Sequence, residues 1–251
     1  MILVGTSGWQ YRDWRGSFYP EKLPQRQWLE YYAGAFATVE VNNAFYRLPE
    51  RATFEAWRAR TPDDFCVAVK VSRYLTHIKR LREPREPVAR FVERATGLGD
   101  RLGPVLLQLP PTLRADPDAL EATLKHFPAA IKVAVEPRHP SWWVDEVRRV
   151  LERHGAALCW ADRHSRPVTP RWRTADFGYL RLHEGRASPH PRYGRAALAT
   201  WAERVGETFP DAPCYVYFNN DPGGAAIVDA IAFARAAARR ELATTRTPAR
   251  T

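Results

Sequence analysis

Short apolar runs alternate along the chain with stretches in which apolar residues recur at helical spacing. Such runs, rich in Val, Leu and aromatic residues, predict strands, whereas the helical spacing predicts amphipathic helices. The predicted strands are Met1–Gly5, Thr38–Val41, Phe65–Lys70, Pro104–Leu109, Lys132–Glu136, Ala157–Asp162, Gly178–His183 and Cys214–Asn219. The predicted helices are Gln25–Phe36, Glu50–Arg60, Val88–Gly97, Asp118–His126, Val144–His154, Arg195–Thr208 and Gly224–Arg240.

The regular alternation of strands and helices predicts a parallel sheet covered by helices. Eight predicted strands in 251 residues suit the usual size of a TIM barrel, so we expect a single (β/α)8 TIM-like barrel over residues 1–240. A doubly wound open sheet is the competing architecture. It is disfavoured because the turn after the first strand, GTSGW, lacks the GxGxxG pattern, and no P-loop sequence occurs.

Two segments lack periodicity. The segment between the sixth and seventh predicted strands, HSRPVTPRWRTADF, contains two prolines and predicts no clear helix. Residues 241–251, at the end of the chain, predict a disordered basic tail.

The alternation of side chains along a strand places the polar residues of the second predicted strand on one face. In a strand successive side chains face opposite ways, so Val39 and Val41 share one face while Glu40 and Asn42 share the other. The same parity groups Lys70, Arg181 and other long polar residues at the carboxyl ends of their strands. In a barrel these ends form the mouth where functional sites recur, so we expect a polar site there.

Three of these residues are candidates for proton transfer. Glu40 and Glu136 could serve as general acid and base, because two carboxylates in different electrostatic settings can have their pKa values driven apart. His183 is the third candidate, since its ordinary pKa lies near neutrality.

The other polar and aromatic residues of the predicted mouth are candidates for ligand binding. Lysine and arginine side chains suit an anion such as phosphate or carboxylate, amides orient polar substituents, and aromatic rings stack on bases or sugars. The set is Ser7, Trp9, Asn42, Tyr46, Lys70, His77, Gln108, Arg138, Arg181, Asn219, Asn220 and Asp221.

A purely structural explanation stands beside the functional one. Glu40 with Lys70 on the adjacent strand, or Asp162 with Arg181, could form buried ion pairs inside the barrel, because a buried charge requires a partner. The aromatic residues of the same loops could fill the mouth as core.

Composition adds little to the choice of function. The net charge of +10 fits a nucleic acid or another anionic partner, but 33 of the 38 basic residues are Arg, a bias that overall amino-acid usage can also produce. No apolar run is long enough for a membrane span, and the first residues lead directly into a strand. We therefore expect a cytoplasmic protein that does not bind membranes, and no specific protein partner is predicted.

A metal or another cofactor is not predicted. His77, His139 and His183 could join carboxylates from separate strands around a divalent ion, but no HExxH or comparable spacing supports such a site.

Several motifs, in order, resemble those of the YecE-like family, domain of unknown function 72. They are GTSGWQYRDWRGSFYP, TVEVNNAFYRLP, TPDDFCVAVKVSRYLTH, LGPVLLQLPP, AVEPRHPSWW, YLRLHEG and YVYFNND, and the resemblance covers Leu3 to Ala234. It implies a TIM-like barrel, as the strand count does, and it implies no particular reaction.

Two classes of function fit the predicted mouth. The first is a hydrolase or lyase that acts on a phosphate-bearing or nucleic-acid substrate. The second is a non-catalytic protein that binds nucleic acid or a phosphate ligand there. A sugar-active enzyme is a further alternative, which a separation of roughly 5 to 9.5 Å between the Glu40 and Glu136 carboxylates would support.

Overall fold

The computed structural model describes residues 1–249. Within this range the strands are β1 (Ile2–Thr6), β2 (Thr38–Val41), β3 (Cys66–Lys70), β4 (Leu102–Gln108), β5 (Val133–Glu136), β6 (Ala157–Leu158), β7 (Trp160–Arg163), β8 (Arg166–Pro167), β9 (Gly178–Glu184) and β10 (Cys214–Phe218). The α-helices are α1 (Trp28–Ala35), α2 (Asn43–Tyr46), α3 (Arg51–Ala59), α4 (Arg85–Ala95), α5 (Pro117–Leu124), α6 (Asp145–Arg153), α7 (Arg195–Thr208) and α8 (Ala225–Ala238). Short 3-10 or π turns lie at Arg12–Trp14, Gln25–Gln27, Tyr74–Ile78, Thr96–Arg101, Pro140–Trp142 and Pro222–Gly224.

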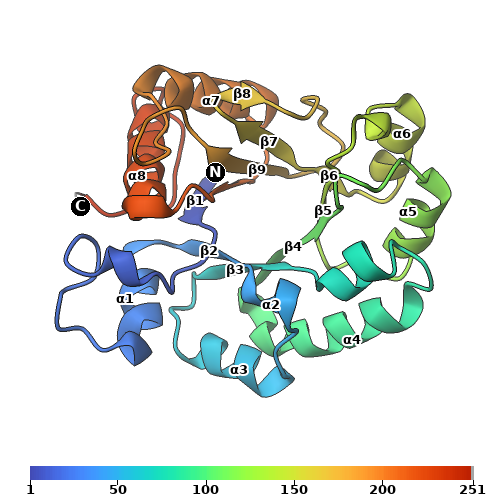
Figure 1. Ribbon diagram of the computed structural model, residues 1–251, viewed down its shortest axis with the longest axis horizontal. Coiled ribbons are helices and arrows are strands. Elements are labelled where there is room, and N and C mark those ends of the chain that lie inside the picture. Colours follow the sequence, from blue (N-terminus) through green and yellow to red (C-terminus); the bar gives the residue numbers. More distant parts are fainter. Residues whose placement is uncertain (250–251) are drawn as a thin grey trace.

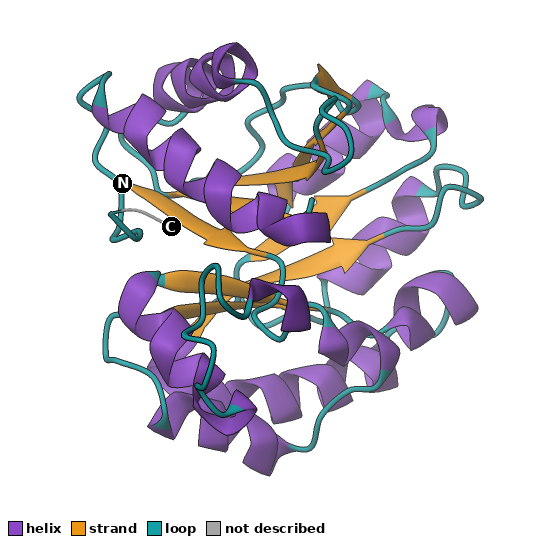
Figure 2. Ribbon diagram, turned by 60° about the vertical axis from the view of Figure 1, so that its left-hand side comes forward, coloured by secondary structure: helices purple, strands orange, loops and turns teal. Residues whose placement is uncertain are grey.

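The helices form where the sequence pattern and the capping residues agree. In α6 the residues Val147, Val150 and Leu151 are buried at helical spacing. Helix α5 begins after Asp116, whose side chain accepts a hydrogen bond from the backbone N–H of Ala119 at 2.9 Å. The helices lie on the outside of the strands, as Figure 2 shows. No helix among residues 1–249 has the length and apolar character needed to cross a membrane.

The prediction of a single (β/α)8 TIM-like barrel is wrong. The strands of residues 1–249 form two five-stranded sheets, ordered β1-β10-β9-β7-β8 and β2-β3-β4-β5-β6. The first sheet is mixed, because β8 pairs antiparallel with β7. The two sheets curl toward each other, and they meet where Ser7, just after β1, forms a single parallel bridge to Glu40 of β2.

The difference from the prediction arises in the sixth predicted strand. This run is interrupted at Cys159, so that β6 and β7 belong to different sheets. The chain then reverses through His164 and Ser165, which have φ values of 54° and 56°. Two central residues with positive φ suit the tight turn of a hairpin. A β-hairpin therefore stands where a (β/α)8 barrel would have a helix between its sixth and seventh strands. Figure 1 shows β8 beside β7 at the edge of the sheet.

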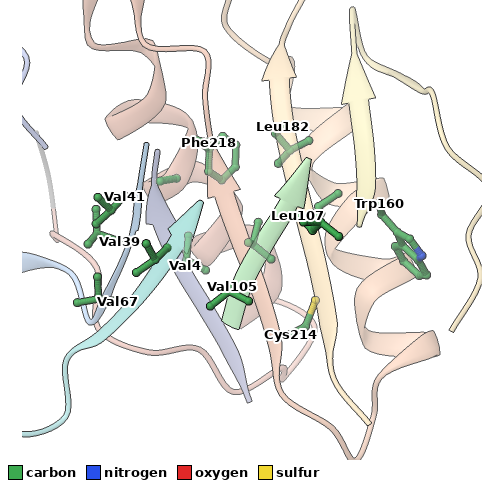
Figure 3. Packing of buried hydrophobic residues seen from close by; sticks show 14 of the residues in the cluster. Val4, Val39, Val41, Val67, Val105, Leu107, Trp160, Leu182, Cys214 and Phe218 are labelled. Carbon is green, nitrogen blue, oxygen red and sulfur yellow. The ribbon is translucent and has the colours of Figure 1, made fainter. Parts of the chain in front are cut away.

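Side-chain parity along the strands separates an outer core from an inner one. Val39, Val67 and Leu182 belong to the outer core, which packs against the helices (Figure 3). A smaller inner cluster contains Ala68 and Tyr179, together with Leu106, Ala134, Ala157, Cys159, Phe177, Tyr215 and Tyr217. Small and aromatic side chains thus fill the space between the sheets below the polar strand ends.

The segment after α8 returns to the first strand. The backbone N–H of Ile2 donates to the carbonyl oxygen of Ala243 at 2.7 Å, and that of Thr245 donates to the carbonyl oxygen of Ile2 at 2.9 Å. Arg246 donates to the carbonyl oxygen of Ala33. These residues lie in the segment for which the sequence predicts a disordered tail, and its composition carries no signal for such contacts. Residues 250–251 of the predicted tail lie outside the described residues.

Gly5 allows the two sheets to approach each other, which gives a first prediction. A Cβ atom at this position would overlap the Thr38 carbonyl oxygen of β2. We therefore expect Gly5→Ala to lower the free energy of unfolding by about 1–3 kcal/mol, as overpacking does in cores. Gly34→Ala is the control, since Gly34 is an exposed residue of α1 with open space around it, and this change should stabilise by about 0.5–1 kcal/mol. Urea unfolding measures both, and equal effects would contradict the close approach.

Candidate functional site

Glu40, the inward-facing carboxylate of β2, is fully buried and held by three donors. Its Oε1 atom accepts hydrogen bonds from Ser7 Oγ at 2.7 Å and from Arg181 Nη2 at 2.8 Å. Its Oε2 atom accepts from the Tyr179 hydroxyl at 2.6 Å. Both oxygens are therefore satisfied within the fold, and Glu40 has a positioning role for Arg181 in this arrangement.

Glu136, at the end of β5, is the second buried carboxylate. Its Oε2 atom accepts hydrogen bonds from Arg181 Nη1 at 2.7 Å and from Gln108 Nε2 at 2.6 Å. Gln108 reaches it because the parallel register of β4 and β5 sets the two residues side by side. The Oε1 atom contacts His183 Nε2 at 2.7 Å and, at the longer distance of 3.5 Å, Arg138 Nη2.

Arg181 joins the two carboxylates across the gap between the sheets. Its side chain is only 1 % exposed, and one guanidinium nitrogen pairs with each acid. Arg181 comes from β9 in the first sheet, whereas Glu40 and Glu136 come from the second. The predicted pair of Asp162 with Arg181 is therefore wrong, and so is that of Glu40 with Lys70. Asp162 instead accepts a hydrogen bond from Trp201 of α7 at 2.9 Å.

The shared arginine decides the charge of both acids. Burial alone would raise the pKa of Glu40, but the Arg181 charge and the hydrogen bonds from Tyr179 and Ser7 hold it below its ordinary value. The pKa of Glu136 lies further below its ordinary value, because the Arg181 charge and the hydrogen bond from His183 outweigh burial. The two pKa values thus move in the same direction. The expectation that they are driven apart, as in an acid and base pair, is not met.

His183, the third residue predicted for proton transfer, is buried in the same cluster. Burial lowers its pKa despite the nearby Glu136 charge, which favours the neutral ring at neutral pH. Its Nδ1 atom lies 3.1 Å from Asn219 Nδ2, and its Nε2 atom lies against the Glu136 carboxylate. With the amide donating to Nδ1, the proton of the neutral ring sits on Nε2 and is donated to Glu136.

A pocket opens beside this pair. Its volume is about 260 Å³, and its lining includes Glu136, Arg138 and His183 together with Arg163 and Thr169. The first three are predicted site residues, which the structure brings together. Arg163 and Thr169 are absent from the predicted set, because the sequence does not predict the hairpin of β7 and β8, which carries Arg163 and precedes Thr169. Arg163 has one sequence signal, since it directly follows a predicted strand.

Lys70, the last residue of β3, belongs to a second group of polar residues at the carboxyl ends of the strands. Its Nζ atom lies 3.8 Å from the centre of the Phe45 ring. Phe45 in turn contacts the His77 ring edge to face, with centroids 4.9 Å apart. Tyr46 follows Phe45 in α2 but points outward and is 74 % exposed. The structure thus brings Lys70 and His77 together and places Tyr46 on the surface.

A smaller pocket lies at the ends of β1 and β2. It has a volume of about 150 Å³ and is lined by Ser7, Trp9, Tyr11 and Asn42, among others. The Oδ1 atom of Asn42 is buried without a hydrogen-bond partner in residues 1–249, so it is an acceptor available to a ligand or water. Trp9 packs edge to face on Trp57 with centroids 5.4 Å apart, as part of the core.

The two residues after Asn219 have structural partners. Asn220 donates to the buried carboxylate of Asp229 at 2.7 Å. Asp221 accepts a hydrogen bond from Trp14 Nε1 at 2.6 Å. Burial raises the pKa of Asp221 to about 7, and the nearby Asp13 charge adds to the effect. Within the described part of the chain, no group of three or more His, Cys, Asp or Glu side chains could hold a metal ion.

Comparison with known proteins places this arrangement in a family. Residues 3–251 match the family described as protein of unknown function DUF72. This chain belongs to the DUF72 family. The UPF0759 protein YecE of Escherichia coli (strain K12) is 32% identical over 174 residues, which cover 67% of this chain and 61% of YecE. The UPF0759 protein YunF of Bacillus subtilis (strain 168) is 26% identical over 257 residues, 89% of this chain and 90% of YunF.

Solved structures of DUF72 proteins share the fold. A crystal structure of a DUF72 family protein from Thermotoga maritima matches with a TM-score of 0.83 and 31% identity, covering 94% of this chain and 98% of that one. A second, from Enterococcus faecalis, matches with a TM-score of 0.81 and 20% identity, covering 95% and 96%.

The buried arginine gives a prediction on stability. Arg181→Met would leave Glu40 and Glu136 buried without their cation, and we expect a loss of about 3–5 kcal/mol at neutral pH. The pKa values of both carboxylates are lower in the folded protein than in the unfolded chain. Their ion pairs with Arg181 therefore stabilise the fold at pH values above the unfolded-state pKa, and this stabilisation is lost as pH falls through the folded-state pKa. The deficit of the variant should therefore shrink toward acid pH.

Urea unfolding of the variant at neutral and acid pH measures this deficit. Arg149→Met is the control, because Arg149 is an exposed arginine of α6. Adding Glu40→Gln and Glu136→Gln to Arg181→Met should recover part of the loss, since no buried charge is then left alone. A deficit that stays the same at all pH values would contradict the role of the carboxylates.

Asp221 gives a prediction on pH. The pKa of Asp221 in the folded protein, about 7, lies above its value in the unfolded chain. As pH rises between these two values, the unfolded chain loses a proton that the folded protein keeps, so the free energy of unfolding falls. Asp221→Asn removes this penalty while its side-chain oxygen can still accept from Trp14. We expect the variant to gain on the order of 1 kcal/mol at pH 8 relative to pH 4, a figure kept small because solvent screens this partly exposed group. Thermal unfolding at both pH values checks it, and a gain independent of pH would refute the assignment.

Proposed function

We propose that this DUF72 protein is a hydrolase or lyase that acts on a phosphate-bearing substrate, which includes nucleic acid, at the pocket beside β5, β7 and β9. One observation carries the proposal: Arg138 and Arg163 line the same pocket as His183 and Glu136. Two guanidinium groups beside a carboxylate and imidazole pair can hold an anion next to a group that moves a proton.

The arginines of the pocket retain free donors for an anion. Arg138 contacts Glu136 through one nitrogen only, at 3.5 Å. Arg163 is exposed and forms no ion pair within residues 1–249. Guanidinium groups bind phosphate oxygens in a bidentate manner, with more directional specificity than ammonium groups. The pocket therefore suits a phosphate group better than a neutral one.

The pair of Glu136 and His183 suits proton transfer. Glu136 is ionised and accepts a hydrogen bond from the Nε2–H group of His183, and this bond orients the imidazole ring. If Asn219 turns aside when substrate binds, Nδ1 becomes free to take a proton from water or a substrate hydroxyl. The negative charge of Glu136 would then stabilise the resulting imidazolium, as a carboxylate does for histidine in other proton-transfer sites.

The alternatives have less support from the geometry. A sugar-active pair needs one carboxyl group that holds a proton, but Arg181 keeps both Glu40 and Glu136 ionised. A binding protein without turnover needs only the arginines and leaves the orientation of His183 by Glu136 without a purpose. It is the second candidate, and the experiment separates it from the first.

The proposal is tested by binding and turnover measured together. Binding of inorganic phosphate and of a short single-stranded oligonucleotide at low salt should weaken at least tenfold in Arg138→Ala/Arg163→Ala, because each arginine contributes about 1.5–3 kcal/mol in a hydrogen bond to a charged group. Arg149→Ala removes one exposed arginine elsewhere and should leave binding unchanged. Phosphomonoesters, phosphodiesters and abasic DNA form the turnover panel, and His183→Ala should retain binding but lose turnover.

Three results would decide against parts of the proposal. Unchanged phosphate affinity in the double arginine variant would reject the pocket as the anion site. Full turnover in His183→Ala would reject the proton-transfer role. Salt-dependent binding with no product from any substrate of the panel would favour the binding protein.

A further inference from the structure

Lys70 is a buried amine without a partner at the polar strand ends. Its side chain is 9 % exposed, yet its Nζ atom forms neither a hydrogen bond nor an ion pair within residues 1–249. The Nζ atom keeps some contact with solvent. It is not one of the side-chain atoms within residues 1–249 that are both fully buried and without a hydrogen-bond partner. A buried charge without a partner is costly, so the position calls for a reason beyond stability.

The surroundings of Lys70 lower the pKa of its amine. Burial lowers this pKa to about 8, the Arg181 charge adds to the lowering, and the charges of Glu136 and Glu40 oppose it. The Phe45 ring, 3.8 Å from Nζ, favours the ammonium form and so opposes this lowering. The two carboxylates that could have paired with Lys70 are already held by Arg181.

A neutral proton acceptor lies on the same aromatic ring as this amine, because Phe45 contacts both the His77 ring and the Lys70 Nζ atom. Burial lowers the pKa of His77 to about 4, and the charges of Lys70 and Arg138 add to the lowering. Thr76 Oγ1 lies 2.8 Å from His77 Nδ1 and fixes the ring. A basic amine and a neutral imidazole thus lie against one ring.

We propose that Lys70 is a nucleophile that forms an imine with the carbonyl group of an aldehyde or ketone carrying a phosphate. The phosphate rests on the proposed function above, in which Arg138 holds it. The imine goes beyond that proposal, because it selects a lyase over a hydrolase and names the class of substrate. Unphosphorylated carbonyl compounds are the alternative that the experiment distinguishes.

The chemical step balances without an oxidant or a reductant. The lone pair of the unprotonated Nζ atom attacks the carbonyl carbon, and the electrons of the carbon–oxygen π bond move to oxygen. Both hydrogens of the amine are transferred to that oxygen, for which His77 is the proposed carrier, and it leaves as water. Once protonated, the imine nitrogen can accept the electron pair of a bond broken at the neighbouring carbon, which is the chemistry of a lyase.

The other lysines provide an internal comparison. The chain has five: Lys22, Lys70, Lys79, Lys125 and Lys132. Lys79 pairs with Glu83, and Lys125 pairs with Glu121. At pH 7 an amine with a pKa of about 8 is unprotonated about two hundred times more often than an ordinary lysine amine. Reaction with an aldehyde should therefore concentrate on Lys70.

The experiment traps the imine in the wild-type protein. Pyridoxal 5′-phosphate is added at pH 7, borohydride reduces any imine to a stable amine, and mass spectrometry of peptides locates the label. We expect Lys70 to carry at least ten times more label than any other lysine. Lys70→Arg should lose this label, whereas Lys125→Arg should keep it, with circular dichroism used to check that both fold. Label spread over the exposed lysines with none on Lys70 would overturn the proposal, whether or not Lys70→Arg folds.

A second probe separates this inference from the proposed function. Pyridoxal has the same aldehyde without the phosphate. If Arg138→Ala/Arg163→Ala reduces labelling of Lys70 by pyridoxal 5′-phosphate but not by pyridoxal, both proposals are supported. Equal labelling by the two probes in every variant would support the nucleophile and reject the phosphate site. Phosphate binding that depends on the arginines, with Lys70 unlabelled by either probe, would reject the nucleophile alone.

Discussion

The structure depends on one buried guanidinium group that must satisfy two buried carboxylates. Arg181 lies between Glu40 and Glu136 at 2.8 and 2.7 Å, and none of the three side chains has an appreciable contact with solvent. A cation of this kind cannot move without leaving an unpaired charge in the interior, which costs several kcal/mol. Because the arginine and the acids belong to different sheets, the ion pairs fix how the two sheets face each other.

This constraint also decides which groups remain available for chemistry. Arg181 takes up the charge of both carboxylates, and the hydrogen bonds of Ser7 and Tyr179 complete the shell of Glu40. The cations at the neighbouring strand ends, Arg138 and Lys70, then have only a weak ion pair or none within residues 1–249. Arg138 retains one long contact, and Lys70 has only an aromatic ring. The proposed phosphate-bearing ligand would supply the negative charge that these cations are missing.

The sequence predicts much of this arrangement because strand parity is a local property. Alternation alone turns Glu40, Lys70 and Arg181 inward, and the elements before the sixth strand lie close to their predicted ranges. It does not predict partners, since these depend on the register between strands distant in the sequence. Asp162 shows the limit, because the interruption before β7 turns it toward Trp201 and away from Arg181. The hairpin of β7 and β8, and Arg163 within it, could not be predicted for the same reason.

Lys70 and Arg181 show how one set of strand ends can serve both stability and chemistry. Both are inward-facing cations at the carboxyl ends of parallel strands, and both are largely buried. Arg181 keeps its charge, because its two acids raise an already high pKa despite burial. Lys70 lies within reach of the same charges but has no acid of its own, so burial shifts its pKa toward neutrality. An arginine could not take this role, since its guanidinium does not give up its proton. The choice of lysine at the end of β3, where no carboxylate within residues 1–249 pairs with it, therefore favours an amine that reacts over a cation that only binds.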